Sequence, residues 1–132
     1  MACVIDTSAI IAVLLSEPER AMLVRATRGT ELLAPASVHW EVGNALSAGL
    51  KRRRLTLAQC QRALSAYAAI PIRFVDVDIA LSLELAAEHS LYADDAYLLT
   101  CALQQRAPLL TLDTGLIRTA NTLGIDLVLP AV

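Results

Sequence analysis

The sequence predicts an α/β protein in which helices cover both faces of a central, mostly parallel sheet of about five strands. Short, unbroken apolar segments alternate along the chain with longer segments of helical character, which is typical of such three-layer α/β/α domains. Hydrophobic residues make up 56% of the 132 residues, enough for a well-filled interior. The length fits one domain, and we find neither a repeat nor a linker.

In the first half of the chain, capping residues and a proline mark the expected boundaries. The side chains of residues 6–8 can cap the helix that follows the first strand, and Ser37 can cap a longer helix. Pro18 stands where a first helical turn tolerates proline. In order, we expect strand 2–5, a helix to about residue 15, helix 18–28, strand 31–34 closed by Pro35, and helix 37–50.

The second half continues the alternation. Thr56 and Asp78 each stand at an expected helix start, and Gly124 stands where the last helix should end. In order, we expect helix 56–69, strand 71–75, helix 78–89, helix 93–106, strand 108–112, helix 114–123 and strand 126–129.

Charge and composition do not identify what the protein binds. The net charge is −2, and ten of the eleven basic residues are arginine, which suits phosphate contacts but does not by itself indicate nucleic-acid binding. The apolar stretch 9–15 is too short to cross a bilayer and follows an acidic residue, so we expect a cytoplasmic protein without a membrane segment. The three cysteines are widely spaced, which predicts buried free thiols.

Two aspartates follow expected strands directly. Asp6 stands at the carboxyl end of strand 2–5 and Asp113 at that of strand 108–112. If both strands are parallel and central, these side chains open into one crevice, where α/β proteins bind ligands. The alternative for each is a structural role as a helix N-cap.

Further acids lie on the inward faces of expected helices. Glu41 shares a face with Val38 and Ala45, although a boundary residue paired with an arginine is the alternative. Asn44, three residues on, could support it. Asp95 shares a stripe with leucines and also faces inward, whereas its neighbour Asp94 could simply complement the helix dipole.

Several carboxylates in one crevice repel one another, and a divalent cation removes that repulsion. An all-oxygen set of ligands suits Mg²⁺ or Mn²⁺, while the lack of a Cys or His cluster in the sequence disfavours zinc. Such a site can activate water and stabilise charge on a phosphodiester.

Four segments that carry these acids resemble, in order, the PIN domain, and in particular the VapC toxins of bacterial toxin–antitoxin pairs. They are VIDTSA (4–9), EVGNAL (41–46), LYADDAYLL (91–99) and PLLTLD (108–113). The resemblance implies a single nuclease domain over residues 1–132, acting as a homodimeric, metal-dependent endoribonuclease on RNA such as tRNA or rRNA. It also implies a cognate antitoxin that holds the enzyme inactive.

The resemblance further assigns the metal-binding and catalytic acids. Carried over by position, they are Asp6, Glu41, Asp95 and Asp113, with Ser8 as a supporting hydroxyl. The family usually has one aspartate in the third segment, whereas this chain has two. Asp95 keeps the usual distance to Asp113, and Asp94 is the substitute.

Two other functions compete with this one. In a Mg²⁺-dependent phosphoryl-transfer domain of the aspartyl-phosphate type, Asp6 would be the nucleophile or a metal ligand. However, position 8 is Ser rather than a second Asp, and the one lysine, Lys51, does not lie late in the chain as a receiver requires. In a catalytically silent docking module, the acids would hold a metal only to bind a basic partner.

Basic and histidine side chains admit simpler explanations. Residues 51–54 form a basic cluster that could contact RNA phosphates or could be a solvated helix end. His39 and His89 are single histidines on helices, and we expect structural roles for both.

Overall fold

The predicted parallel sheet is present in the computed structural model, which describes residues 1–129. The order across the sheet is β3-β2-β1-β4, and all three pairings are parallel. β1 therefore lies inside the sheet, with Val4 opposite Leu33 on one side and Leu109 on the other. The strands are β1 (Ala2–Ile5), β2 (Glu31–Pro35), β3 (Ile72–Val75) and β4 (Leu109–Leu110).

The expectation of a fifth strand over residues 126–129 is wrong. Only Leu127 pairs there, through an isolated parallel bridge to Leu109. The strand expected over 108–112 is also shorter, because the N–H groups of Leu112 and Asp113 donate to the side-chain hydroxyls of Ser8 and Thr111. These donors are thus unavailable to a neighbouring strand, and β4 ends early.

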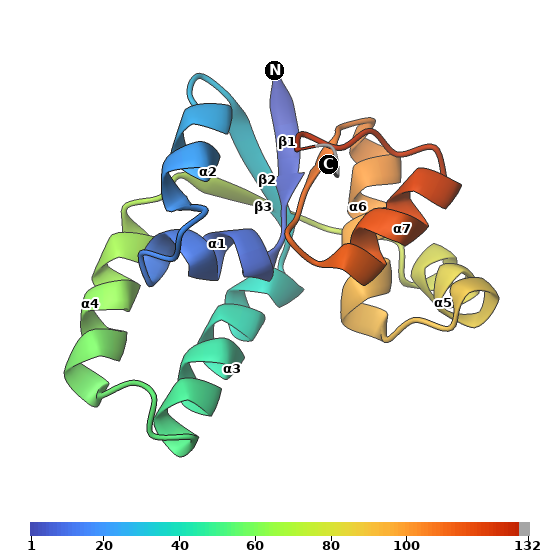
Figure 1. Cartoon of the computed structure of the whole chain (residues 1–132). Coiled ribbons are helices and arrows are strands. Elements are labelled where there is room, and N and C mark those ends of the chain that lie inside the picture. The colour runs from blue at the N-terminus through green and yellow to red at the C-terminus, as the bar shows by residue number, and fades with distance from the viewer. Residues whose placement is uncertain (130–132) are drawn as a thin grey trace.

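Helices cover both faces of the sheet, as the three-layer prediction requires. Figure 1 shows α1, α2 and α4 on the left of the sheet and α5, α6 and α7 on the right, while α3 runs downward from the lower end of the strands. The helices are α1 (Thr7–Leu14), α2 (Arg20–Ala26), α3 (Ser37–Lys51), α4 (Leu57–Ala68), α5 (Ile79–His89), α6 (Ala93–Gln105) and α7 (Thr114–Thr122).

Most of the capping predictions are confirmed. Thr56 caps α4 in a reciprocal arrangement with Gln59, and the side chain of Asp78 accepts the N–H group of Leu81 in the first turn of α5. The prediction that Ser37 caps α3 is wrong. Ala36 precedes the helix with a helical backbone (φ −56°, ψ −27°), so Ser37 is already inside the first turn, where its hydroxyl cannot act as a cap.

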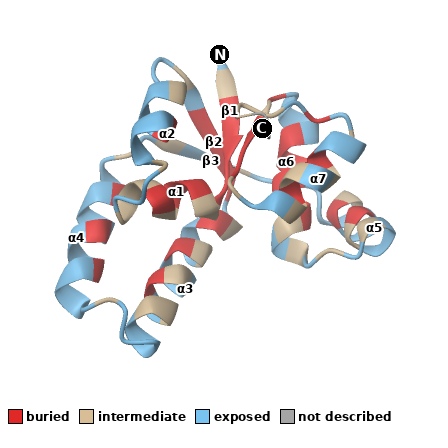
Figure 2. Cartoon of the chain, in the orientation of Figure 1, coloured by how far each residue is buried: buried red, intermediate tan, exposed pale blue. Residues whose placement is uncertain are grey.

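The core lies around β1 and β2 and the inner faces of the helices, shown in red in Figure 2. The side chains of Cys3 and Val4 are completely buried, which keeps β1 rigid up to its carboxyl end. The three cysteines are buried free thiols, as predicted. Among the helices of the described residues, none combines the length and the apolar character needed to span a membrane.

Candidate active site

Asp6 occupies the junction between β1 and α1. Its backbone N–H group donates to the carbonyl of Leu110, which joins the ends of β1 and β4. The residue is only 4% exposed, and its Oδ1 accepts the N–H group of Ala9 at 3.1 Å as the N-cap of α1. Asp6 therefore does act as a helix N-cap, which was the alternative role predicted for it. This one hydrogen bond leaves most of the lone pairs of the buried carboxylate for other partners.

Two hydroxyl groups supply those partners. The Ser8 hydroxyl donates to Oδ1 of Asp6 at 2.7 Å, and the Thr111 hydroxyl donates to Oδ2. Burial raises the pKa of Asp6 and repulsion from Asp113 adds to this effect, while the hydrogen bonds oppose it. Sequence reasoning did not single out Thr111. The available signal was a lone hydroxyl in an apolar strand, two residues before Asp113.

Asp113 begins α7 at the same edge of the sheet. Its Oδ1 accepts the N–H group of Leu116 at 3.1 Å, so the capping alternative is present here also. Oδ2 accepts no hydrogen bond from residues 1–129, and the side chain is exposed. One oxygen of Asp113 thus remains open to solvent or a ligand.

Glu41 reaches this edge from α3. Its Oε2 accepts a hydrogen bond from the Thr7 hydroxyl at 3.2 Å, whereas no arginine of the described residues pairs with it. Burial, followed by repulsion from Asp94, raises the pKa of Glu41 from 4.5 to about 7. The hydrogen bond from Thr7 opposes that shift, and repulsion from Asp95 and Asp6 adds to it.

Asp94 and Asp95 both lie in the first turn of α6, but their surroundings differ. Asp95 is partly buried, and burial followed by repulsion from Asp113, Asp6 and Asp94 raises its pKa. Asp94 is exposed and acts mainly as a neighbouring charge on Glu41. The fold therefore brings Asp6, Glu41, Asp95 and Asp113 close enough for their charges to interact.

Asn44 is not tied to these acids. It lies exposed on α3, and its side chain makes no hydrogen bond within residues 1–129, while its backbone carbonyl accepts one from the hydroxyl of Ser47. The structure thus places Asn44 one helical turn after Glu41 without a hydrogen bond between them among residues 1–129.

The donor set fits a hard divalent cation. In the part of the chain that the structure describes, no three acidic, histidine or cysteine side chains form a closed metal-binding group as placed. Mg²⁺ does not need one, because it keeps several waters and binds through one or two carboxylates. Three hydrogen bonds leave about one free lone pair on the Asp6 carboxylate, and Asp113 keeps a free oxygen. The carboxyl groups that raise each other's pKa are those that a cation would stabilise.

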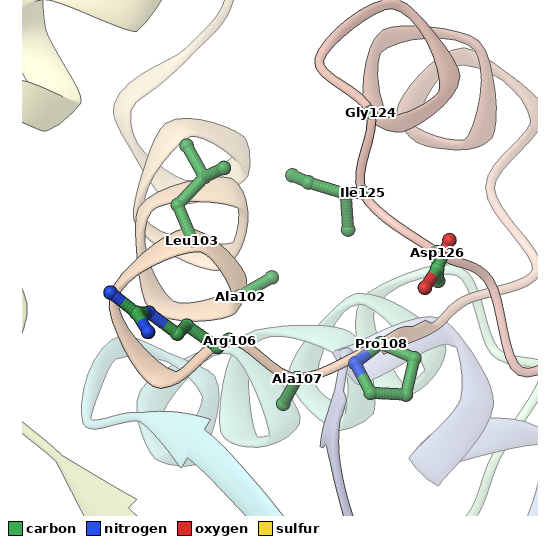
Figure 3. Close-up of a pocket in the computed structure, with 8 residues that line it drawn as sticks. All are labelled: Ala102, Leu103, Arg106, Ala107, Pro108, Gly124, Ile125 and Asp126. Carbon is green, nitrogen blue, oxygen red and sulfur yellow. The ribbon is translucent and has the colours of Figure 1, made fainter.

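A pocket of about 370 Å³ opens beside the acids, and both Asp95 and Asp113 line it. A second pocket, of about 280 Å³, lies at the amino end of β4, where Pro108 precedes the strand (Figure 3). Its charged lining residues are Arg106 and Asp126, which Figure 3 shows at opposite ends of the pocket. None of the predicted acids lines that second pocket, whereas Asp95 and Asp113 line the first.

The comparisons with known proteins agree with the fold. A family model of the PIN domain matches residues 3–122. The structure is similar to that of PAE2754 from Pyrobaculum aerophilum (TM-score 0.70, 21% identity), covering 89% of this chain and 78% of that one. No curated protein sequence matches the chain.

Two toxin–antitoxin structures also share the fold. VapBC2 from Rickettsia felis, bound to a DNA fragment from their promoter, matches with a TM-score of 0.69 and 16% identity over 96% of this chain and 97% of that one. A toxin–antitoxin complex from Klebsiella pneumoniae matches with a TM-score of 0.59 and 21% identity over 98% and 99%. At these identities the likeness concerns the fold.

Proposed function

The chain belongs to the PIN-domain family, and we propose that it is a metal-dependent endoribonuclease, the toxin of a toxin–antitoxin pair, with residues 1–132 as one nuclease domain. The observation that carries this proposal is the convergence of four carboxyl groups from separate elements at one edge of the sheet. Their mutual repulsion has no structural benefit, since a protein built only for stability would keep like charges apart.

The four acids share one role in the proposed site, which is to bind the metal ion. We assign the binding of Mg²⁺ or Mn²⁺ to Asp6, Glu41, Asp95 and Asp113. When bound, such an ion activates water and stabilises the charge that develops on a phosphodiester. Asp6 is held in one orientation by the hydroxyls of Ser8 and Thr111, and Thr7 orients Glu41 in the same way. Fixed carboxylates need little reorganisation on binding the ion.

The remaining predicted residues take supporting parts. Ser8 links the two sides of the site, because its hydroxyl donates to Asp6 and accepts the N–H group of Leu112 at 3.0 Å. Asp94 adds negative charge next to Glu41. Asn44, exposed on α3 one helical turn after Glu41, would support the site as a polar neighbour of that acid.

We propose two protein partners. The toxin–antitoxin assemblies in the similar structures support a cognate antitoxin for this chain. The exposed apolar side chains support a homodimer, because contact between two copies would remove some of them from water. More than half of the surface of each of the following is exposed: Trp40, Leu57, Ile79, Leu83 and Tyr92. A cytoplasmic location follows from an RNA substrate such as tRNA or rRNA.

The decisive experiment is cleavage of a panel of structured RNAs, including tRNA and rRNA fragments, by protein freed of any co-purifying partner. Parallel reactions contain Mg²⁺, Mn²⁺ or EDTA, and an Asp6→Asn variant is compared with Asp126→Asn, an exposed aspartate at the other end of β4. We expect cleavage only with metal, reduced about 100-fold or more in Asp6→Asn, as loss of a stabilising group at the reacting centre typically costs. Undiminished cleavage by Asp6→Asn would disprove the proposal.

A further inference from the structure

The pocket beside the acids carries a feature that the proposed chemistry does not use. Asp95 and Asp113 form part of its wall, and Leu91 and Leu116 add apolar surface. Arg118, from the second turn of α7, also lines it. At about 370 Å³ the pocket falls within the size range of small-ligand sites, about 300–1,000 Å³.

Arg118 is free to bind a ligand. It makes no ion pair with any of residues 1–129, although two aspartates line the same pocket. The neighbouring hydroxyls are already engaged, since Thr119 donates to the carbonyl of Gly115 at 3.2 Å and Thr122 donates to that of Arg118 at 3.1 Å. The guanidinium group is a permanently charged donor, and His89 is the other side chain of the lining that carries nitrogen.

Resting on the proposed ribonuclease function, we infer that this pocket is a subsite for the nucleotide next to the scissile bond and that Arg118 binds its phosphate. Carboxylates repel an RNA backbone, so a positively charged side chain beside the acids would stabilise a strand that reaches them. A guanidinium group matches the geometry of a phosphate with two parallel hydrogen bonds. Leu91 and Leu116 offer apolar surface to the ribose or base.

The inference also specifies what the contact does. A phosphate contact sets the register of the strand but carries no sequence information. Arg118 is thus a positioning residue for the substrate, and its loss should weaken binding of all RNA sequences to a similar extent.

The test measures binding rather than cleavage, so that it does not depend on turnover. Short fluorescein-labelled RNAs are titrated in two backgrounds: the wild-type protein in EDTA, and Asp6→Asn with Mg²⁺. In each, Arg118→Gln is compared with Arg118→Lys and with Arg62→Gln, which removes the same charge from α4 on the opposite side of the sheet (Figure 1). RNAs that carry one neutral methylphosphonate linkage at each position in turn complete the set.

We expect Arg118→Gln to weaken binding about tenfold, the order of one charge-assisted hydrogen-bonded contact. The slope of log affinity against log salt should fall in magnitude by about 0.7, as for one lost phosphate contact on a single strand. Arg118→Lys should retain the slope with part of the affinity, and Arg62→Gln should match wild type. One methylphosphonate position should weaken binding to wild type but not to Arg118→Gln.

Three results would overturn the inference, and the first two of them leave the proposed function standing. If RNA is bound and cut but Arg118→Gln binds normally, the subsite is wrong and the ribonuclease stands. The subsite is also wrong, and the ribonuclease still stands, if every methylphosphonate weakens RNA binding to Arg118→Gln as much as it weakens binding to wild type. If wild type neither binds nor cuts any RNA, both proposals fail together. Circular dichroism of each variant excludes unfolding as the cause of a loss, and Arg118→Lys keeps the test valid if Arg118→Gln does not fold.

Discussion

Raising the pH of the metal-free protein tests whether the native fold disfavours the charged forms of these carboxyl groups. The pKa of Glu41 rises from 4.5 to about 7 on folding, first through burial and then through repulsion from Asp94. Between about pH 4.5 and pH 7 the folded state binds more protons at Glu41 than the unfolded state does. The free energy of unfolding therefore falls as the pH increases through this window. Asp6 and Asp95, whose pKa values are also raised, act in the same direction.

The size of the effect follows from the Glu41 shift. A full change from 4.5 to about 7 corresponds to about 3 kcal/mol. Because Glu41 is only partly buried, solvent screening reduces its contribution to about 1–2 kcal/mol. For a domain of this length that amounts to a loss of about 3–8 °C in Tm between about pH 5 and pH 7.5.

The assay is thermal unfolding in EDTA followed by circular dichroism, with Glu41→Gln as the test variant. Gln keeps the shape and can still accept the hydrogen bond from Thr7, but it cannot ionise. We expect Glu41→Gln to be more stable than wild type at about pH 7.5 and equal to it near pH 5. Glu84→Gln, at an exposed position of α5, is the control. A Glu41→Gln variant no more stable than Glu84→Gln at about pH 7.5 would refute the reasoning, as would a wild-type stability that rises with pH.

Three further predictions concern single side chains. Thr111→Val removes a donor to Asp6 and should lower the free energy of unfolding by about 1–3 kcal/mol in urea titrations, with Thr111→Ser restoring it; an unchanged midpoint would contradict this. In the RNA assay, Asp95→Asn should abolish cleavage while Asp94→Asn only weakens it, and the reverse order would assign the ligand to Asp94 instead. Ser37→Ala should leave stability unchanged or raise it by up to about 1 kcal/mol in thermal unfolding, because the buried Ser37 hydroxyl has no hydrogen-bond partner among the described residues. A marked loss of stability would show that this hydroxyl is satisfied.

The general position of the site was predictable because parallel topology fixes it. Strands rich in apolar residues and separated by helices indicate a parallel sheet, and neighbouring parallel strands end at one edge. Ile5 pairs with Leu110 in register, which brings the residues that follow β1 and β4 together. The sequence alone therefore placed Asp6 and Asp113 at a common edge without any knowledge of side-chain contacts.

The hydroxyl network at this edge was not predictable in the same way. The sequence predicts Thr111 to be an interior residue of a strand that runs to residue 112. Its role depends on the strand ending at Leu110, and that end is caused by bonds from two backbone N–H groups to hydroxyls, one of them on Ser8, more than a hundred positions away in the chain. Local patterns carry no information about such a contact. For the same reason a complete strand was predicted over residues 126–129, where the structure has an isolated bridge at Leu127.

Stability and the proposed chemistry oppose each other most directly at Asp6. Its carboxylate is fixed by Ala9, Ser8 and Thr111, and these hydrogen bonds favour the charged form, yet burial outweighs them and the pKa of Asp6 is still raised. The end of β1 therefore holds a carboxyl group whose charged form the metal-free fold disfavours. A cation bound there lowers the free energy of the folded state alone, since the unfolded chain does not assemble the same carboxylates. If the proposed site binds an ion, ion binding and folding are coupled through the same atoms, and the geometry that weakens the metal-free protein would give the ion its affinity.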